Sequence, residues 1–392
     1  MFKQLAAITL MNLQTLPQRL GSCSVIVIGI AGVVAVLVSV LAMSAGFRHT
    51  LADSGRADRA IVLRGGSDAE LNSNLTREDI DVISNAPGPA KDAAGQAVLS
   101  DEIVSVVNVP KNDTGTDANI TLRGVGDKVL EVRPELRLVS GRMFRPAVRE
   151  LIAGVGAVGQ FQGLTVGSIL HLRNADWTVT GVFSSNGDIH ESELFADVNT
   201  VGSALERKGY SSAVVLLTSA GAFPAFKDAL TTDPRLKVDV QREQGYYAAQ
   251  SQQLTTTINI VGNTVAIIMA IGAMFGALNS MYSAVAARGL EIATLRAIGF
   301  GAAPVLLSVM IETLILSLIG GIIGAALAWL FFNGHTVSTL GGAFAQVVFQ
   351  LRVTPVLVVT GIVWACMIGL LGGFFPALRA ARLPVAAALR AV

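Results

Sequence analysis

Residues 25–45 read VIVIGIAGVVAVLVSVLAMSA, and no charged side chain lies between Arg19 and Arg48. A helix needs about 20 consecutive apolar residues to cross the hydrocarbon core of a bilayer, so this run is long enough to span it. The sequence therefore predicts a membrane α-helical protein with four transmembrane helices and one large α+β domain inserted between the first and the second. The three other apolar runs of similar length lie at about 258–287, 303–332 and 355–375.

The charged residues are distributed unevenly along the 392 residues. They make up 15% of the sequence, against about 25% in an average soluble domain. All but two of the 28 acidic residues lie between residues 46 and 255, and the exceptions are Glu291 and Glu312. Because the middle is acidic and the flanks are basic and apolar, the sequence lacks the continuous basic face of a nucleic-acid-binding protein.

Basic residues gather on one side of the predicted spans, and such loops stay in the cytoplasm because they resist translocation. In the loop on the opposite side, 334–354, Arg352 is the only lysine or arginine. We therefore expect both chain ends in the cytoplasm and the large domain in the periplasm of a bacterium with two membranes, with the spans in its inner membrane. The basic residues on the cytoplasmic side are Lys3, Arg19, Arg288, Arg296, Arg379, Arg382 and Arg390.

The first residues, 1–20, predict an amphipathic helix on the cytoplasmic membrane surface that ends at Pro17. Its apolar residues include Phe2, Leu5, Leu13 and Leu16. The remaining predicted segments are a first span at 21–45, a periplasmic α+β domain with helical stalks at 46–257, a second span at 258–287, a cytoplasmic loop at 288–302, a third span at 303–333, a periplasmic loop at 334–354, a fourth span at 355–376 and a cytoplasmic tail at 377–392.

The periplasmic domain reads as a mixture of strands and short helices. Thr76 and Asp79 have the spacing of a capping box, which predicts a helix at 76–84, and a second helix is expected at 222–230. Residues 46–54 and 244–257 lack strong helix breakers, and we interpret them as a helical stalk joining the domain to the membrane. Strands are expected in the β-branched runs 60–63, 103–107, 169–172, 177–183 and 213–217.

No arrangement of residues predicts catalysis, a metal or a directly bound cofactor. Gly154, Gly156 and Gly159 match a dinucleotide fingerprint, but the segment after them reads as turn and strand, so we expect a turn beside a strand. No lysine follows a glycine, which excludes a Walker loop in this sequence. The four histidines are scattered. The sequence therefore predicts a non-catalytic chain, with any ATP bound by a partner.

Small and charged residues within the spans indicate where helices pack. Glycines spaced four apart let helix backbones approach closely in lipid, within one chain or between two copies. Glu312 is the only charged residue well inside a span, and we expect it to be hydrogen bonded, with Arg288 or Arg296 as candidate partners. The spaced pairs are Gly272 with Gly276, Gly320 with Gly324, and Gly369 with Gly373.

The cytoplasmic loop 288–299 reads RGLEIATLRAIG and predicts a short helix that Gly299 ends. Arg288 and Glu291 lie three apart and could pair on that helix. A short helix between two spans suits insertion into a partner's groove, although a plain connector is the simpler alternative. The candidate contact residues are Arg288, Glu291, Ile292, Leu295, Arg296 and Gly299.

This loop resembles the shared stretch of a permease family that includes the macrolide exporter MacB, the cell-division protein FtsX and the lipoprotein-releasing permeases. That stretch reads approximately Arg-x-x-Glu-Ile-Gly-x-x-Arg-Ala-Ile/Leu-Gly, and Ala293 departs from it. Residues 376–390 resemble the family's C-terminal signature, and 140–144 resemble its periplasmic core domain. The matching residues are Arg288, Glu291, Ile292, Arg296, Ala297, Ile298, Gly299, Glu312, Gly320, Gly321 and Gly324.

The resemblance implies a type VII ABC transporter permease that works by mechanotransmission. The loop 288–299 would be the coupling helix, docked on a separate ABC ATPase dimer whose ATP-driven closure moves the stalk and the outer domain. A second permease copy, a periplasmic adaptor and an outer-membrane duct would complete a MacB-like machine for export or extraction. The alternatives are an FtsX-like signal relay that controls a periplasmic hydrolase, and a lipoprotein-releasing permease.

Overall fold

The structure is a computed structural model that describes residues 2–14, 20–341 and 345–382. Its contacts divide the chain into two compact units. The first, here called the helical unit, comprises residues 1–45, 257–335 and 351–392. The second, here called the core domain, comprises residues 46–256 and 336–350. Leu16, Pro17 and the last ten residues of the predicted tail lie outside the described residues.

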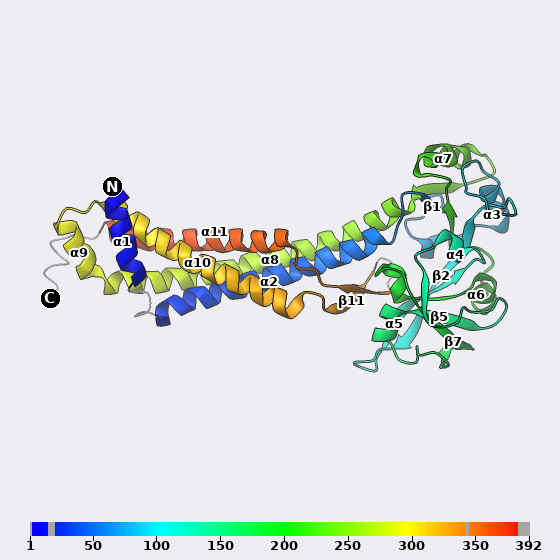
Figure 1. The fold of residues 1–392 in the computed structure, drawn as a ribbon, viewed down its shortest axis with the longest axis horizontal. Helices are drawn as coiled ribbons and strands as arrows, with labels where there is room; N and C mark the ends of the chain where they lie inside the picture. The colour runs from blue at the N-terminus through cyan, green and yellow to red at the C-terminus, as the bar shows by residue number, and fades with distance from the viewer. Residues whose placement is uncertain (1, 15–19, 342–344, 383–392) are drawn as a thin grey trace. The chain divides into compact units, whose positions relative to one another are not determined.

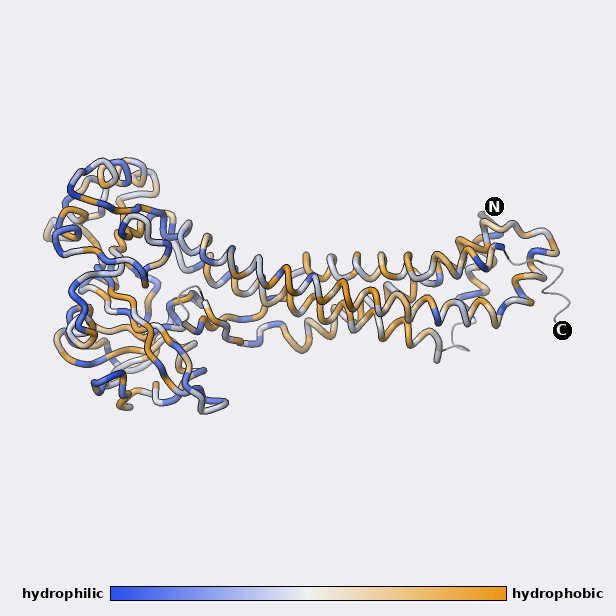
Figure 2. Tube along the Cα trace, turned by 180° about the vertical axis from the view of Figure 1, so that it is seen from behind, coloured by the Kyte–Doolittle hydropathy of each residue, from blue (hydrophilic) through white to orange (hydrophobic). Residues whose placement is uncertain are grey.

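Long helices make up the helical unit, and two of them continue into the core domain (Figure 1). Among the described residues, four helices, named α2, α8, α10 and α11, are long and apolar enough to cross a membrane, which confirms the predicted fold class. Figure 2 shows apolar residues along much of their length. The helices are α1 Phe2–Gln14, α2 Leu20–Asp53, α8 Glu243–Ala287, α9 Gly289–Ala297, α10 Ala302–Phe332 and α11 Pro355–Ala381.

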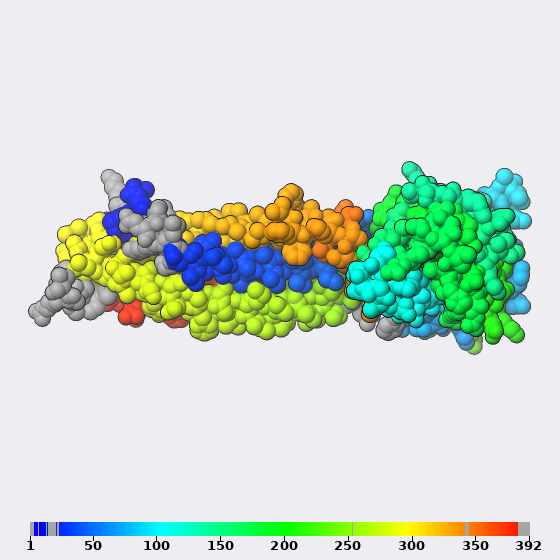
Figure 3. Space-filling model, turned by 90° about the horizontal axis from the view of Figure 1, so that it is seen from below, coloured from blue at the N-terminus to red at the C-terminus, as the bar shows by residue number. Residues whose placement is uncertain are grey.

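Glycines allow α2, α10 and α11 to pack closely. A Cβ added to Gly324 of α10 would lie 2.4 Å from the carbonyl oxygen of Ala31 on α2, and one added to Gly320 would lie 2.9 Å from that of Val27. On α11, Gly369 and Gly373 meet Ser317 and Thr313 of α10, which an added Cβ would approach to 2.3 Å. Such contacts replace the hydrophobic driving force that lipid does not provide. In Figure 3, α2 lies between α8 and α10 on one face of the bundle.

The other predicted pair behaves differently. Gly272 and Gly276 of α8 have nothing within 4 Å of an added Cβ. The nearby apolar residues Ile268 and Phe275 are 65% and 61% exposed. These α8 glycines therefore do not pack against the described part of this chain, whereas those of α10 and α11 do.

A ten-stranded sheet forms the frame of the core domain, in the order β10-β1-β9-β2-β3-β8-β5-β7-β4, with β6 paired to β7. The β3–β8 and β5–β7 pairs are parallel, and the other pairs are antiparallel. The strands are β1 Arg59–Arg64, β2 Leu99–Pro110, β3 Asp117–Val125, β4 Arg137–Gly141, β5 Glu150–Gly154, β6 Ile169–Leu172, β7 Ala175–Ser184, β8 Glu193–Asp197, β9 Ser212–Leu216 and β10 Val238–Arg242.

A small apolar cluster of the core domain contains Val129 and Phe195, and short helices also cover two larger clusters. One lies around β1, β9 and β10 and includes Phe226 and Leu230. The other lies around β3, β5 and β7 and includes Trp177 and Val201. Their burial fixes which faces of the strands point inward. The helices are α3 Arg77–Ser84, α4 Val129–Val132, α5 Val155–Gln160, α6 Val198–Ala204 and α7 Phe223–Thr232, with 3-10 turns η2 Glu70–Asn72, η3 Ile189–Ser192 and η4 Ala220–Ala222.

Two local features show where the sequence was informative and where it was not. Thr76 and Asp79 form the capping box that begins α3, as predicted. The segment predicted as a loop at 334–354 contains a hairpin of β11 Thr336–Leu340 and β12 Gln346–Gln350 instead. The Ser192 hydroxyl accepts a 2.8 Å hydrogen bond from the Val348 backbone N–H, so β12 belongs to the core domain.

Substitution of Gly324 tests the packing of α2 against α10. Because a real Cβ almost never approaches another atom within 3.0 Å, we expect Gly324→Ala to force the helices apart. The cost is of the order found for overpacked cores, about 1–3 kcal/mol. Thermal unfolding of the detergent-solubilised chain should show a lower Tm.

Gly32→Ala of α2 is the matched control, because no described atom lies within 4 Å of its added Cβ. Its Tm should equal that of the unchanged chain. Equal Tm values for both variants would contradict the close contact between α2 and α10.

Candidate functional site

The short helix α9 follows α8 and precedes α10 in the helical unit. Arg288 is its N-cap residue and Ile298 its C-cap residue. Gly299 follows with a φ of 102°, a conformation that favours glycine, and so ends the helix as the sequence predicted.

A buried ion pair anchors the start of α9. The Arg288 Nη1 atom donates to the Glu312 Oε2 atom of α10 at 3.1 Å, and both side chains are almost fully buried. Arg288 Nη2 also donates to the carbonyl oxygen of Asn12 at 3.5 Å, while the Asn12 side chain donates to the Ser308 hydroxyl at 2.8 Å. A carboxylate within a membrane span costs about 2.5–3.5 kcal/mol, so a guanidinium partner is what Glu312 needs. We call these four residues the brace.

The structure separates the residues predicted to contact a partner. Ile292 is 7% exposed and packs into the apolar core of the helical unit, and Leu295 packs against that core. Glu291 and Gly299 are exposed, and Arg296 is half-buried. The large apolar residues exposed here are Leu290 of α9 and its C-cap residue Ile298, at 48% and 69%. Which residues of α9 are buried depends on contacts with α1 and α10, and the loop sequence alone does not show these contacts. The sequence therefore did not identify Leu290 and Ile298 as exposed residues.

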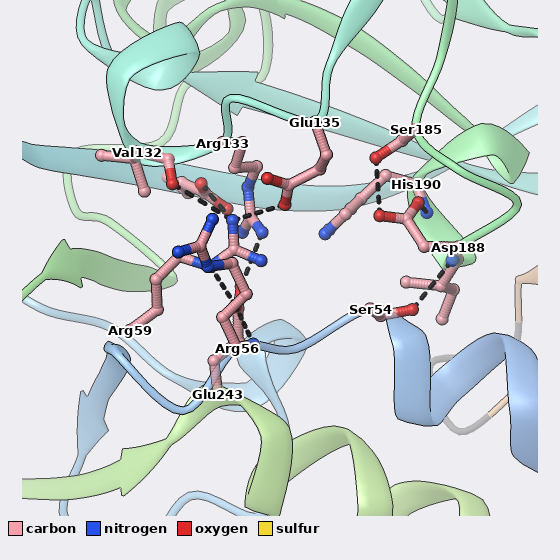
Figure 4. Close-up of polar contacts among 12 residues, drawn as sticks. Ser54, Arg56, Arg59, Val132, Arg133, Glu135, Ser185, Asp188, His190 and Glu243 are labelled. Atoms are coloured by element: carbon pink, nitrogen blue, oxygen red, sulfur yellow. Dashed lines mark hydrogen bonds and ion pairs between the residues drawn. The ribbon is translucent and has the colours of Figure 1, made fainter. Parts of the chain in front are cut away.

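A second and larger set of buried charges lies in the core domain, close to the ends of α2 and α8 (Figure 4). Its side chains come from β1, β2, β3, β8, η2, η3, the segment that follows α4 and the first residue of α8. We call it the charge network. Its members are Arg59, Glu70, Glu102, Arg123, Arg133, Glu135, His190, Glu193 and Glu243.

Glu243 holds two arginines together. Its Oε1 accepts from Arg133 Nη1 at 2.5 Å, and its Oε2 accepts from Arg59 Nε at 2.5 Å. All three side chains are fully buried. Arg59 Nη1 also donates to Glu135, whose side chain is 14% exposed. Removing one member of such a pair costs about 3–5 kcal/mol, because a buried charge is left without its partner.

Arg123 extends the network across the sheet. Its guanidinium donates to Glu70 of η2, Glu102 of β2 and Glu193 of β8, at distances of 2.6–3.1 Å. Glu102 also accepts from Arg133 at 3.4 Å, which joins this cluster to Glu243. Carboxylates and guanidinium groups thus form one continuous chain of contacts from the start of α8 to β8.

Two acids of this region have opposite pKa shifts. Burial raises the pKa of Asp188 to about 6, although His190 and the Ser185 hydroxyl oppose the shift. Burial would also raise the pKa of Glu193, but the Arg123 guanidinium and His190 outweigh it and hold that pKa well below its usual range. Arg133 and Arg59 likewise overcome burial and lower the pKa of Glu243.

Sequence reasoning missed the charge network. The sequence gives one weak indication of it. Arg59 and Glu102 directly precede the β-branched runs 60–63 and 103–107, and both lie on strands where side chains can be buried. The partners of each charge lie tens of residues away in the chain, however. Which carboxylate meets which guanidinium depends on the strand order, and local patterns do not specify that order.

The glycine-rich segment at 154–159 is not the turn that we expected. Strand β5 ends at Gly154 and the six-residue helix α5 follows it directly. A Cβ on Gly154 would lie 2.2 Å from the carbonyl oxygen of Glu191, so the backbone of η3 fills the space in front of this glycine. Among the described residues no cluster of His, Cys, Asp or Glu could hold a metal ion.

Asp188 gives the core domain a pH-dependent stability. Its pKa is about 6 in the folded state and 3.8 in the reference state. The folded state therefore binds the extra proton, and the stabilisation is complete below the unfolded pKa and lost as the pH rises through about 6. A difference of two pKa units corresponds to about 3 kcal/mol. We expect Asp188→Asn to remove this dependence, because its side-chain oxygen still accepts from the His190 N–H.

The measurement is urea unfolding at about pH 5 and about pH 7.5, followed by the fluorescence of Trp177. Trp329 and Trp364 are replaced by Phe, because the sequence has three tryptophans and only Trp177 lies in the core domain. An unchanged difference between the two pH values in Asp188→Asn would contradict the assignment.

Both units of the chain match models of known protein families. A model of the MacB-like periplasmic core domain matches residues 22–233, and a model of the FtsX-like permease C-terminal domain matches residues 263–385. The macrolide export ATP-binding/permease protein MacB of Hahella chejuensis is 25% identical over 416 residues, which cover 98% of this chain and 59% of that protein. The chain thus spans less than two thirds of that relative's length.

Three further similar proteins are a curated permease and two domains of solved structure. The uncharacterised ABC transporter permease YknZ of Bacillus subtilis is 24% identical over 70% of each chain. Among solved structures, the extracellular domain of the transporter YknZ from Gram-positive bacteria has 21% identity and a TM-score of 0.37, covering 47% of this chain and 99% of that domain. The periplasmic region of MacB from Actinobacillus actinomycetemcomitans has 16% identity and a TM-score of 0.36, covering 51% and 92%.

The first family model alone matches more than half of the chain, and the second matches most of the rest. The chain belongs to the family of ABC transporter permeases that combine a MacB-like periplasmic core domain with an FtsX-like permease domain.

Proposed function

We propose that this chain is the permease subunit of an ABC exporter in which ATP hydrolysis by a separate ATPase subunit moves the core domain. The observation that carries the proposal is α9, a short helix that exposes Leu290 and Ile298 while the buried Arg288–Glu312 pair fixes its start. A short helix that is fixed at its start and exposes a large apolar side chain near each end suits insertion into a partner's groove.

A separate subunit that binds ATP is part of this proposal. These 392 residues contain no lysine after a glycine, so they contain no Walker loop. The MacB relatives are described as ATP-binding/permease proteins, which makes an ABC ATPase dimer the natural partner here. With both chain ends in the cytoplasm, α9 faces that partner and the core domain lies in the periplasm.

The wider assembly is proposed on two grounds. Gly272 and Gly276 leave a small-residue face on α8 beside exposed Ile268 and Phe275, and a second copy of this chain suits such a face. The likeness to MacB favours a periplasmic adaptor and an outer-membrane duct. Export or extraction of a substrate from the periplasmic side is therefore favoured over an FtsX-like relay to a hydrolase or a lipoprotein-releasing role.

Substitutions on the exposed face of α9 test the coupling assignment. We expect Leu290→Asp with Ile298→Asp to abolish co-purification with the ATPase subunit, because two carboxylates replace the apolar contact. The measurement is recovery of the ATPase on tagged permease, together with its stimulated ATP hydrolysis.

Ile169→Asp is the control, because Ile169 is also 69% exposed but lies on β6 of the core domain. It should leave the complex intact. Retention of the complex by the α9 double variant would refute the coupling role.

The brace is tested by a double-mutant cycle. Arg288→Met leaves Glu312 buried without its cation and should destabilise the helical unit by about 3–5 kcal/mol. Glu312→Met added to Arg288→Met should restore most of the Tm, since an apolar pair replaces the ion pair. The stability-restored double variant should still stimulate the ATPase poorly, because α9 has lost its fixed start. Additive losses of Tm would contradict a direct pairing of the two residues.

A further inference from the structure

The ends of α2 and α8 that belong to the core domain touch directly through their backbones. A Cβ added to Gly55, just after α2, would lie 2.4 Å from the Cα and N atoms of Gln244 in the first turn of α8. The backbone N–H of Arg56 donates to Glu243 Oε2 at 3.2 Å. The two helix ends therefore form one compact junction rather than two independent connections.

Both helix ends are also fixed to the body of the core domain. Ser54 donates to the Thr50 carbonyl oxygen within α2 and accepts a 2.9 Å hydrogen bond from the Ile189 N–H of η3. Glu243 joins α8 to Arg59 of β1 and to Arg133, which follows α4. One turn later, the Tyr246 hydroxyl accepts from the Glu70 N–H of η2. Figure 4 shows the contacts of Ser54 and of Glu243 with Arg59 and Arg133.

Ion pairs of the charge network connect this junction with the two larger apolar clusters. Arg59 begins β1, which contributes to the cluster containing Phe226. Arg123 and Glu193 lie on β3 and β8, which contribute to the cluster containing Trp177. Ion pairs have a fixed geometry that apolar contacts lack, so a displaced Glu243 must pull the groups that it holds.

We propose that Glu243, clamped by Arg59 and Arg133, is a positioning residue that makes the core domain follow displacements of α2 and α8. This inference rests on the proposed function and names the place where motion passes from helix to sheet. The clamp does not itself contact substrate or nucleotide.

The test uses the full chain in lipid nanodiscs with its co-purified ATPase subunit. Cys23 and Cys366 are replaced by Ser, and spin labels are attached at Ile169→Cys of β6 and Phe331→Cys of α10, both of which are exposed. The distance distribution between the labels is measured with and without Mg²⁺–ATP and vanadate. We expect a nucleotide-dependent shift in the unchanged clamp and loss of that shift in Glu243→Gln.

Two controls separate transmission from stability. Leu230→Ala removes a buried side chain from the cluster containing Phe226 and lowers stability without touching the clamp. Asp92→Asn weakens a mostly buried ion pair with Lys128, which lies in the core domain outside the charge network, and leaves both contacts of Glu243. Both controls should keep the nucleotide-dependent shift, and all variants should retain the ATPase subunit.

The outcomes discriminate between the two proposals. A shift that persists in Glu243→Gln overturns the clamp and leaves the proposed function standing. Loss of the shift in Leu230→Ala as well overturns the clamp, because lowered stability would then explain both variants. Absence of any shift in the unchanged clamp, with ATPase bound, overturns the proposed function and the clamp together.

Discussion

The core domain depends on the burial of one carboxylate between two guanidinium groups. Glu243 is the first residue of a 45-residue helix, and its side chain is fully enclosed with those of Arg59 and Arg133. Burying three charges is expensive, and apolar residues of similar size often give equal or greater stability. The ion pairs instead connect specific parts of the domain, because each oxygen of Glu243 accepts from an arginine of a different segment.

The helical unit contains a smaller arrangement of the same kind. Arg288 and Glu312 are buried together, and their contact joins the start of α9 to α10. In both units a short or terminal piece of helix is fixed by charge rather than by apolar burial alone. The apolar side chains Leu290 and Ile298 consequently remain on the surface of α9 instead of being needed to hold it. Arg288 thus anchors the short helix, whereas Leu290 and Ile298 are the residues available for docking.

Hydrophobic length and local periodicity were sufficient to predict the four long helices, the strands near 60–63 and 169–172, and the capping box at Thr76. They did not predict the hairpin β11–β12, which contacts the rest of the core domain through Ser192, a residue far away in the sequence. The Arg288–Glu312 pair was within reach, since a lone buried acid requires a cation and few were available. The charge network was not, because its partners meet only through a strand order in which distant segments are neighbours.

In the proposed mechanism, events at α9 reach the core domain through the ends of α2 and α8. Hydrogen–deuterium exchange of the full chain with its ATPase in nanodiscs tests it most directly, compared with and without Mg²⁺–ATP and vanadate. We expect altered protection in peptides covering residues 185–197 and 243–256, where η3, β8 and the start of α8 meet. Altered exchange confined to α9 and α10, with those two peptides unchanged, would contradict it.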